Sequence, residues 1–130
     1  MTVIGSNTLN IINAYLSSNM GPSDSFLEDF TDLFNDQKEV LLLGDLNICS
    51  INEEKHPILR KLKTLGFKER VKFPSHIAGR QIDHVLQFSP INSSPQVVQV
   101  CQFGQYFTDH DLMVVNMSES SNILQVSIQY

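Results

Sequence analysis

Carboxylate, amide and imidazole side chains recur in three short motifs that adjoin apolar runs. The motifs are Gly-Asp-Leu-Asn at 44–47, Arg-Gln-Ile-Asp-His-Val at 80–85 and Thr-Asp-His-Asp at 108–111. Carboxylates are costly to bury, so Asp45, Asp83 and Asp109 each need a metal ion, a histidine or an arginine nearby. Any one of them alone fits a loop or capping residue better than a catalytic group. Three together, with Asn47 and His110 beside them, favour a site for a hard cation such as Mg²⁺, which prefers oxygen ligands and binds together with substrate phosphate.

Hydrophobic patterning predicts the strands that would position these residues. The run Glu39 to Gly44 is short and almost continuously apolar, which is typical of a central strand buried on both faces. Residues 122–129 alternate apolar with polar side chains and fit an edge strand. The other predicted strands are 8–16, 81–88, 96–103 and 112–117.

Two amphipathic helices are predicted between the strands. One covers 25–36, where Ser25 and Glu28 form a capping-box pattern before apolar residues at helical spacing. The other starts near Pro57 and ends at Gly66. The order strand, helix, strand, helix and then a run of strands predicts a layered α/β or α+β fold.

The length and composition of the chain set limits on its class. A chain of 130 residues with 42% hydrophobic content makes one domain or part of a larger one. No apolar run approaches the about 20 residues of a membrane helix, and the first residues lack the pattern of a signal peptide. Cys49 and Cys101 show neither zinc-ligand spacing nor a disulfide framework. We therefore expect an intracellular protein, nuclear or cytoplasmic and not secreted, with no membrane partner.

The formal net charge of −5 hides a strong asymmetry along the chain. Eight of the nine basic residues lie between positions 55 and 80, and five acids lie within 24–36. The acidic cluster fits a solvated helix face. The basic segment fits either a solvated face or a surface that binds nucleic-acid phosphates, because neutralising phosphates dominates such affinity. The candidates for phosphate or nucleic-acid contact are Lys61, Lys63, Arg70 and Lys72.

Four motifs in a fixed order resemble the C-terminal half of the endonuclease/exonuclease/phosphatase superfamily, which includes abasic-site and retrotransposon endonucleases. They are Asn-Ala-Tyr-Leu at 13–16, the motifs at 44–47 and 80–85, and Thr-Asp-His-Asp-Leu-Met-Val-Val at 108–115. The resemblance covers residues 8–117 and implies that 1–130 is a single partial domain. It implies half of a four-layered α/β sandwich, with a mixed, mostly antiparallel sheet and helices on one face.

The resemblance also implies residue roles. Asp45 would activate the attacking water, Asn47 would hydrogen-bond the water or the phosphate, and Tyr15 would approach the scissile phosphate. His110 would contact the phosphate, and Asp83 would orient and charge that histidine. Competing explanations remain for two of them: Tyr15 fits an aromatic residue at a strand end, and Asn47 fits turn chemistry after a glycine.

Other polar residues near the motifs receive different interpretations. The resemblance makes Asp109 a metal-site aspartate, with Mg²⁺ or Mn²⁺ as the cofactor. Arg80 is expected to anchor a loop and Asp111 to belong to a strand. His84 should be structural, because neighbouring side chains in a strand point to opposite faces and Asp83 takes the other one. His56 and His76 are expected on the surface or in loops, with His76 within reach of a nucleic-acid backbone.

The family's domain is about twice this long. The half that carries its main metal-ligand glutamate has no counterpart before Tyr15. We therefore expect weak metal affinity, and an exposed apolar sheet face that a second chain or the missing half would cover.

Three functions follow as hypotheses. The first is a Mg²⁺-dependent phosphodiester hydrolase, a DNA endonuclease. The second is a truncated, catalytically inactive half-domain that persists as a fragment or an interaction module. The third is a phosphatase that acts on lipid or nucleotide phosphates.

Overall fold

The computed structural model describes residues 1–6, 8–17, 23–91, 93, 96–105, 107–119 and 122–128, with the backbone alone for 23–24 and from 118 onward. Its helices are α1 (Ser23–Leu33) and α2 (Pro57–Leu65). Its strands are β1 (Thr2–Gly5), β2 (Leu9–Asn13), β3 (Glu39–Asp45), β4 (Lys68–Glu69), β5 (Asp83–Phe88), β6 (Val97–Phe103), β7 (Leu112–Glu119) and β8 (Asn122–Ile128).

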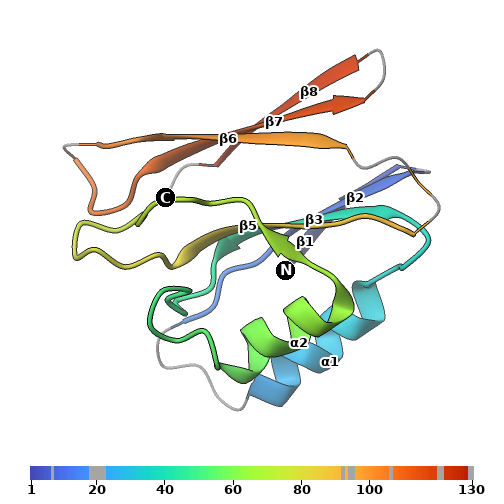
Figure 1. The fold of residues 1–130 in the computed structure, drawn as a ribbon, viewed down its shortest axis with the longest axis horizontal. Coiled ribbons are helices and arrows are strands. Elements are labelled where there is room, and N and C mark those ends of the chain that lie inside the picture. Colours follow the sequence, from blue (N-terminus) through green and yellow to red (C-terminus); the bar gives the residue numbers. More distant parts are fainter. Residues whose placement is uncertain are drawn as a thin grey trace.

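The strands form two sheets that lie in separate layers. The larger sheet has five strands in the order β1-β2-β3-β5-β4, and the smaller has the order β6-β7-β8. Among the described strands, β2 and β3 pair in parallel and every other pair is antiparallel. Figure 1 shows both helices against one face of the five-stranded sheet and the three-stranded sheet over its other face. The fold is therefore α+β, and the predicted mixed, mostly antiparallel sheet with helices on one face is confirmed.

Strand β3 lies at the centre of the molecule and is buried along its whole length. Its side chains alternate between two cores, as the pleat of a strand requires. Val40 and Leu42 pack in the core under the helices, whereas Leu41 and Leu43 pack in the core between the sheets. The prediction of a central strand buried on both faces is confirmed.

A hydrophobic core fills the space between the two sheets and covers the sheet face that was expected to be exposed. Met113, Val115 and Met117 of β7 are fully buried against Leu41 and Leu43. The face of the five-stranded sheet opposite the helices is thus covered from within the chain. The expectation that this face would be exposed was wrong, because strands that looked like further members of one sheet fold over it as a second layer.

The helix boundaries differ from the prediction at one helix and agree at the other. Helix α1 begins at Ser23 and ends at Leu33, so Ser25 lies inside its first turn and does not precede it. Helix α2 begins at Pro57 as predicted, and Gly66 ends it in the left-handed conformation with φ 103°. His56, expected on the surface or in a loop, caps α2 by accepting the Ile58 N–H on Nδ1 at 3.2 Å.

Two strands were not predicted. Strand β1 is exposed throughout, and β4 contains only two residues, so neither carries a periodic apolar signal. Strand β8 lies at the edge of the smaller sheet, as its alternating sequence predicts. Within the residues that the structure describes, neither helix has the length and apolar content needed to span a membrane. Cys49 is buried and Cys101 is exposed, and both are free thiols.

Candidate functional site

Three of the predicted site residues meet where one strand of the larger sheet ends, its neighbour begins, and a strand of the smaller sheet is about to begin. Strand β3 ends at Asp45 and the antiparallel β5 begins at Asp83, and the register places these two residues opposite each other. His110 stands two residues before β7. One ligand atom from each of the three lies within 4.8 Å of the others. The topology therefore brings together residues from three separate motifs.

The closest contact in this cluster joins Asp83 and His110. The Asp83 Oδ2 atom lies 2.9 Å from His110 Nδ1. Asp83 is 0% exposed, and its backbone N–H donates to the hydroxyl of the fully buried Ser75 at 3.1 Å. Among the described residues the other carboxylate oxygen, Asp83 Oδ1, has no hydrogen-bond partner although it is buried. A buried carboxylate oxygen without a partner is rare and is a natural place for an ion or an ordered water.

The surroundings of His110 favour its charged form. Burial by itself would lower the pKa of the imidazole, but the hydrogen bond and charge of Asp83, followed by the charges of Asp45 and Asp109, raise the pKa above its usual value. Because Nδ1 faces Asp83, the Nε2 atom is the one that faces the site. His110 Nε2 lies 3.9 Å from Asp45 Oδ2 and 3.9 Å from Asp109 Oδ1.

The environment of Asp45 favours the neutral, protonated form of its carboxyl group. Burial, with a smaller contribution from the neighbouring charge of Asp83, raises the pKa of Asp45. The backbone N–H of Asn47 donates to Asp45 Oδ1 at 2.9 Å and partly offsets that rise. Asp45 therefore holds a proton more readily than an exposed aspartate, which is the property of a general base.

Asn47 and Tyr15 both lie close to Asp45 along the chain or across it: the Asn47 N–H donates to the Asp45 side chain, and Leu16, next to Tyr15, donates to the Asp45 backbone. Asn47 has a left-handed backbone with φ 52°, and its side-chain amide donates to the carbonyl of Leu16. In this arrangement Asn47 ties the segment after β3 to the segment after β2. Tyr15 follows β2, and the Leu16 N–H next to it donates to the Asp45 carbonyl at 2.9 Å. The Tyr15 residue is 71% exposed and so remains accessible to a large ligand.

The motif at 44–47 begins with Gly44, a position that leaves no space for a side chain. Its φ of 142° lies outside the range that other residues adopt readily, and a Cβ atom there would collide with the carbonyl oxygen of Ala14. The backbones of β3 and of the segment after β2 can approach each other only because this position has no side chain. That close approach sets Asp45 beside the segment that carries Tyr15.

Asp109 belongs to a second group, which includes a residue that the sequence did not assign to the site. His76 Nε2 lies 3.0 Å from Asp109 Oδ2, and the rings of His76 and His110 form a T-shaped pair with centroids 5.0 Å apart. His76, Asp109 and His110 form a second possible metal-binding group. The expected metal-site aspartate thus contacts His76, and no signal of sequence spacing links them across 33 residues.

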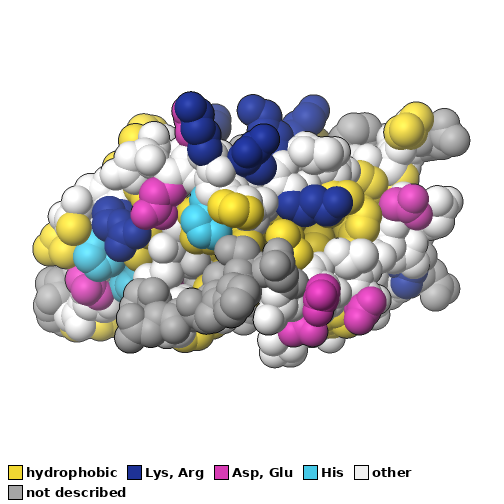
Figure 2. Space-filling view, turned by 90° about the horizontal axis from the view of Figure 1, so that it is seen from below, with side chains coloured by type: hydrophobic (Ala, Val, Ile, Leu, Met, Phe, Trp, Pro, Cys, Tyr) yellow, Lys and Arg dark blue, Asp and Glu magenta, His cyan; other side chains and the backbone are white. Residues whose placement is uncertain are grey.

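The predicted phosphate-binding residues are divided between two parts of the fold. Lys61 and Lys63 are exposed on α2, and Lys72 is exposed in the segment after β4. The half-buried Arg70 donates from Nε to Gln87 Oε1 at 2.9 Å. Figure 2, which views the face that carries the helices, shows several Lys and Arg side chains along one long edge and others scattered over the face. Arg80 lies within 3.5 Å of the Asn47 carbonyl and within 3.9 Å of Glu53, which fits the predicted loop anchor.

His84 is structural, as strand alternation predicts. It is fully buried, with Nδ1 2.6 Å from Glu69 Oε2 and Nε2 2.7 Å from the Ile48 carbonyl. Both ring nitrogens face acceptors, so both carry protons and the ring is an imidazolium. Burial would lower the pKa of His84, but the hydrogen bond and charge of Glu69 raise it.

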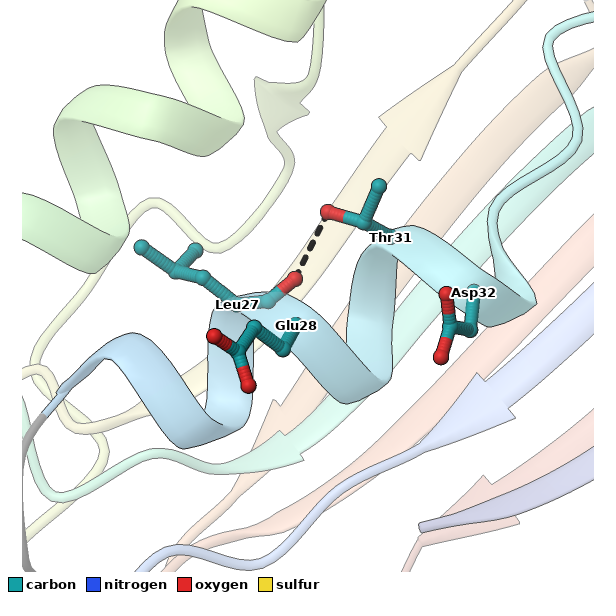
Figure 3. A pocket seen from close by; sticks show the side chains of 4 residues that line it. All are labelled: Leu27, Glu28, Thr31 and Asp32. Atoms are coloured by element: carbon teal, nitrogen blue, oxygen red, sulfur yellow. Dashed lines mark hydrogen bonds between the residues drawn. The ribbon is translucent and has the colours of Figure 1, made fainter.

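A surface hollow on α1 has no residue in common with either cluster. Leu27, Glu28, Thr31 and Asp32 line it, and the Thr31 hydroxyl donates to the Leu27 carbonyl at 2.6 Å (Figure 3). Its two acids, Glu28 and Asp32, are exposed. The hollow therefore fits the solvated acidic face that the sequence predicts, and the candidate site stays at the strand ends.

Comparisons with known proteins add no assignment. No protein-family model matches the sequence, no curated protein shows significant similarity to it, and no solved structure shows significant similarity to the fold. The likeness of the four motifs to the endonuclease/exonuclease/phosphatase superfamily stays a resemblance, and the function has to be inferred from the geometry of the site.

Proposed function

We propose that this protein is a divalent-metal-dependent phosphodiester hydrolase that cleaves DNA inside the cell. One observation carries the proposal: ligand atoms of Asp45, Asp83 and His110, from three distant motifs, lie within 4.8 Å of one another at the ends of the strands. Their environments push the pKa of Asp45 and the pKa of His110 both upward, which prepares a base and a cation in the same place. Groups with shifted pKa values cluster at functional sites.

The chemistry divides between these residues. Asp45 takes a proton from a water molecule as that water forms a bond to phosphorus, and the bond from phosphorus to the leaving oxygen breaks. The leaving oxygen then takes a proton from solvent. His110, held as an imidazolium by Asp83, donates from Nε2 to a non-bridging phosphate oxygen whose negative charge grows in the transition state.

The residues present fit a bound Mg²⁺ or Mn²⁺. Asp83 Oδ1 is a buried carboxylate oxygen without a partner among the described residues, and Asp45 lies opposite it in the register. Asp83 would therefore hold the ion through Oδ1, with Asp109 in the adjoining group, and Asp45 stays available as the base. Such an ion would neutralise charge on the phosphate.

Nucleic acid is favoured over a small phosphoester by the exposed surroundings of the cluster. Tyr15 is 71% exposed, and Lys72 is exposed three residues before Ser75, the hydroxyl partner of the Asp83 N–H. A polymer with several phosphates can contact such separated groups at once, whereas a small phosphoester cannot.

Nicking of supercoiled plasmid DNA with Mg²⁺, compared with the same reaction in chelator, tests the proposal. We expect the wild-type protein to nick the plasmid. The rate should fall by about 100-fold or more in Asp45→Asn and in His110→Gln, because each substitution removes a group that acts in the transition state. Asp111→Asn is the matched control. Asp111 is next to His110 in sequence but takes part in no step of the mechanism, so the variant should keep full activity.

Two results would overturn the proposal. Nicking that survives in both Asp45→Asn and His110→Gln would show that the cluster does no chemistry. Hydrolysis of lipid or nucleotide phosphates without cleavage of DNA would replace the substrate class.

A further inference from the structure

A second carboxylate–imidazole pair stands beside the first. Asp109 Oδ2 lies 3.0 Å from His76 Nε2, and the ring of His76 lies edge-to-face with that of His110, at an interplanar angle of 87°. The His76 side chain is largely buried, although Asp109 is 60% exposed. None of the roles proposed above uses His76.

Hydrogen bonding defines which nitrogen of His76 carries the proton. The Ala78 N–H donates to His76 Nδ1 at 3.1 Å, so that nitrogen is an acceptor. A neutral imidazole has one acceptor and one donor nitrogen, which leaves the proton on Nε2, aimed at Asp109. A metal ion would need the lone pair of Nε2, and the Ala78 N–H excludes the tautomer that supplies it. The arrangement therefore favours a hydrogen-bond donor over a metal ligand.

The loop that carries His76 is fixed to the segment around His110. The Ile77 N–H donates to the Asp109 carbonyl at 2.8 Å, and the Asp111 N–H donates to the Ser75 carbonyl at 2.8 Å. His76 and His110 thus form an isolated antiparallel β-bridge. These bonds present the His76 ring to the Asp109 carboxylate without relying on the side chains.

We propose that His76 is a positioning residue of the site: as a neutral imidazole protonated on Nε2, it holds Asp109 Oδ2 so that Asp109 Oδ1 faces His110 Nε2. Without this bond an exposed carboxylate would sample other rotamers and leave the site. The inference deepens the proposed function, on which its role in catalysis rests, but the hydrogen bond itself does not depend on that function.

Nitrogen-15 NMR of the full chain tests the bond without any activity. The sequence has four histidines, so a long-range proton–nitrogen spectrum at about pH 8, above the usual imidazole range, can resolve them. We expect His76 to show a protonated Nε2 and a bare Nδ1, with the signals assigned by their loss in His76→Gln. Addition of one equivalent of Zn²⁺ should leave this pattern unchanged. A His76 protonated on Nδ1, or one that binds Zn²⁺ through Nε2, would overturn the proposal.

Rescue by a matched variant tests the positioning role. The amide of His76→Gln can still donate to Asp109, whereas His76→Leu cannot. We expect nicking to fall at least tenfold in His76→Leu and to recover most of that loss in His76→Gln, while circular dichroism shows both variants folded. Equal activity in folded Leu and Gln variants would refute the role. If the wild-type protein does not nick DNA, the proposed function fails, and the tautomer measurement still decides whether His76 holds Asp109.

Discussion

The 2.9 Å contact between Asp83 Oδ2 and His110 Nδ1 joins the two sheets of the protein at the candidate site. It predicts that His110 remains charged to a higher pH than an ordinary histidine. His110 should be fully charged at low pH. The contribution of its imidazolium to activity should then be lost as the pH rises through the raised pKa of His110. Proton NMR titration of the ring should give a midpoint above the usual 6.5.

Asp83→Asn provides the comparison for that titration. Loss of the carboxylate charge should bring the pKa of His110 down towards or below its usual value, because only the smaller effects of the Asp45 and Asp109 charges then oppose burial. An unchanged His110 midpoint in folded Asp83→Asn would contradict the assignment of Asp83 as the charging group.

Asp45→Asn should separate activity from stability. Folding raises the pKa of Asp45 above the unfolded value, so ionised Asp45 destabilises the folded state, and this loss grows as the pH rises through the unfolded pKa to the folded pKa and then stays constant. The asparagine keeps an oxygen that accepts the Asn47 N–H. We expect the variant to be inactive yet to have a higher free energy of unfolding than the wild type at neutral pH, measured by urea denaturation. A lower free energy would show that the charge of Asp45 is compensated.

Glu69→Gln should destabilise the protein through His84. The Glu69 carboxylate accepts from His84 and, through Oε1, from the backbone N–H groups of Val71 and Val85, both at 3.1 Å. Removing one member of a buried ion pair costs about 3 kcal/mol, and urea denaturation at neutral pH would measure it. Because folding raises the pKa of His84, this stability is fully present below the unfolded pKa and is lost as the pH rises through the folded pKa. The difference between wild type and variant should therefore shrink at alkaline pH, and a constant difference would argue against the imidazolium.

Gly44→Ala should disrupt the junction between β2 and β3. The new Cβ meets the Ala14 carbonyl oxygen, and the backbone there has a positive φ. We expect a loss of about 3 kcal/mol or more in the free energy of unfolding. Gly104→Ala is the control, because no atom lies within 4 Å of its added Cβ. That variant should stay within about 0.5 kcal/mol of the wild type. Similar values for both would show that the close approach at Gly44 relaxes easily.

Lys72 and Lys61 should differ in DNA binding. Both are exposed, but Lys72 follows β4 on the way to Ser75 and the site, whereas Lys61 lies on α2. Lys72→Gln should reduce the dependence of log affinity on log salt by about one phosphate contact, and Lys61→Gln should leave it unchanged. Fluorescence anisotropy with a short DNA duplex at several salt concentrations measures both. Equal slopes for the two variants would place DNA elsewhere.

The parts of the fold that sequence could predict are those with a strong periodic signal. The continuous apolar run of β3, the proline and glycine that bracket α2, and the alternation of β8 each specify an element locally. The sequence carries no such signal for which strands belong to which sheet, because strands of both sheets bury one face against the same core. Strand β1 was missed for a different reason: all four of its residues are exposed, so they give no apolar pattern.

The site was predictable to the extent that its residues end or begin strands. Asp45 and Asp83 meet because antiparallel neighbours bring the end of one strand to the start of the next. His76 could not be found in this way, because a loop with no periodicity carries it to Asp109. The contact of Asn47 with Leu16 also depends on a left-handed backbone that its sequence neighbours do not reveal.

The construction of the site from both sheets has a consequence for folding. Asp45 and Asp83 can assemble as soon as β3 pairs with β5, but His110 arrives only when the smaller sheet docks. The Asp83–His110 contact therefore needs the docking of one sheet on the other in addition to the pairing of strands within the larger sheet. Hydrogen exchange should therefore show the strands β6 to β8 opening more often than β3. Each such opening would dismantle the Asp83–His110 pair while leaving the larger sheet intact.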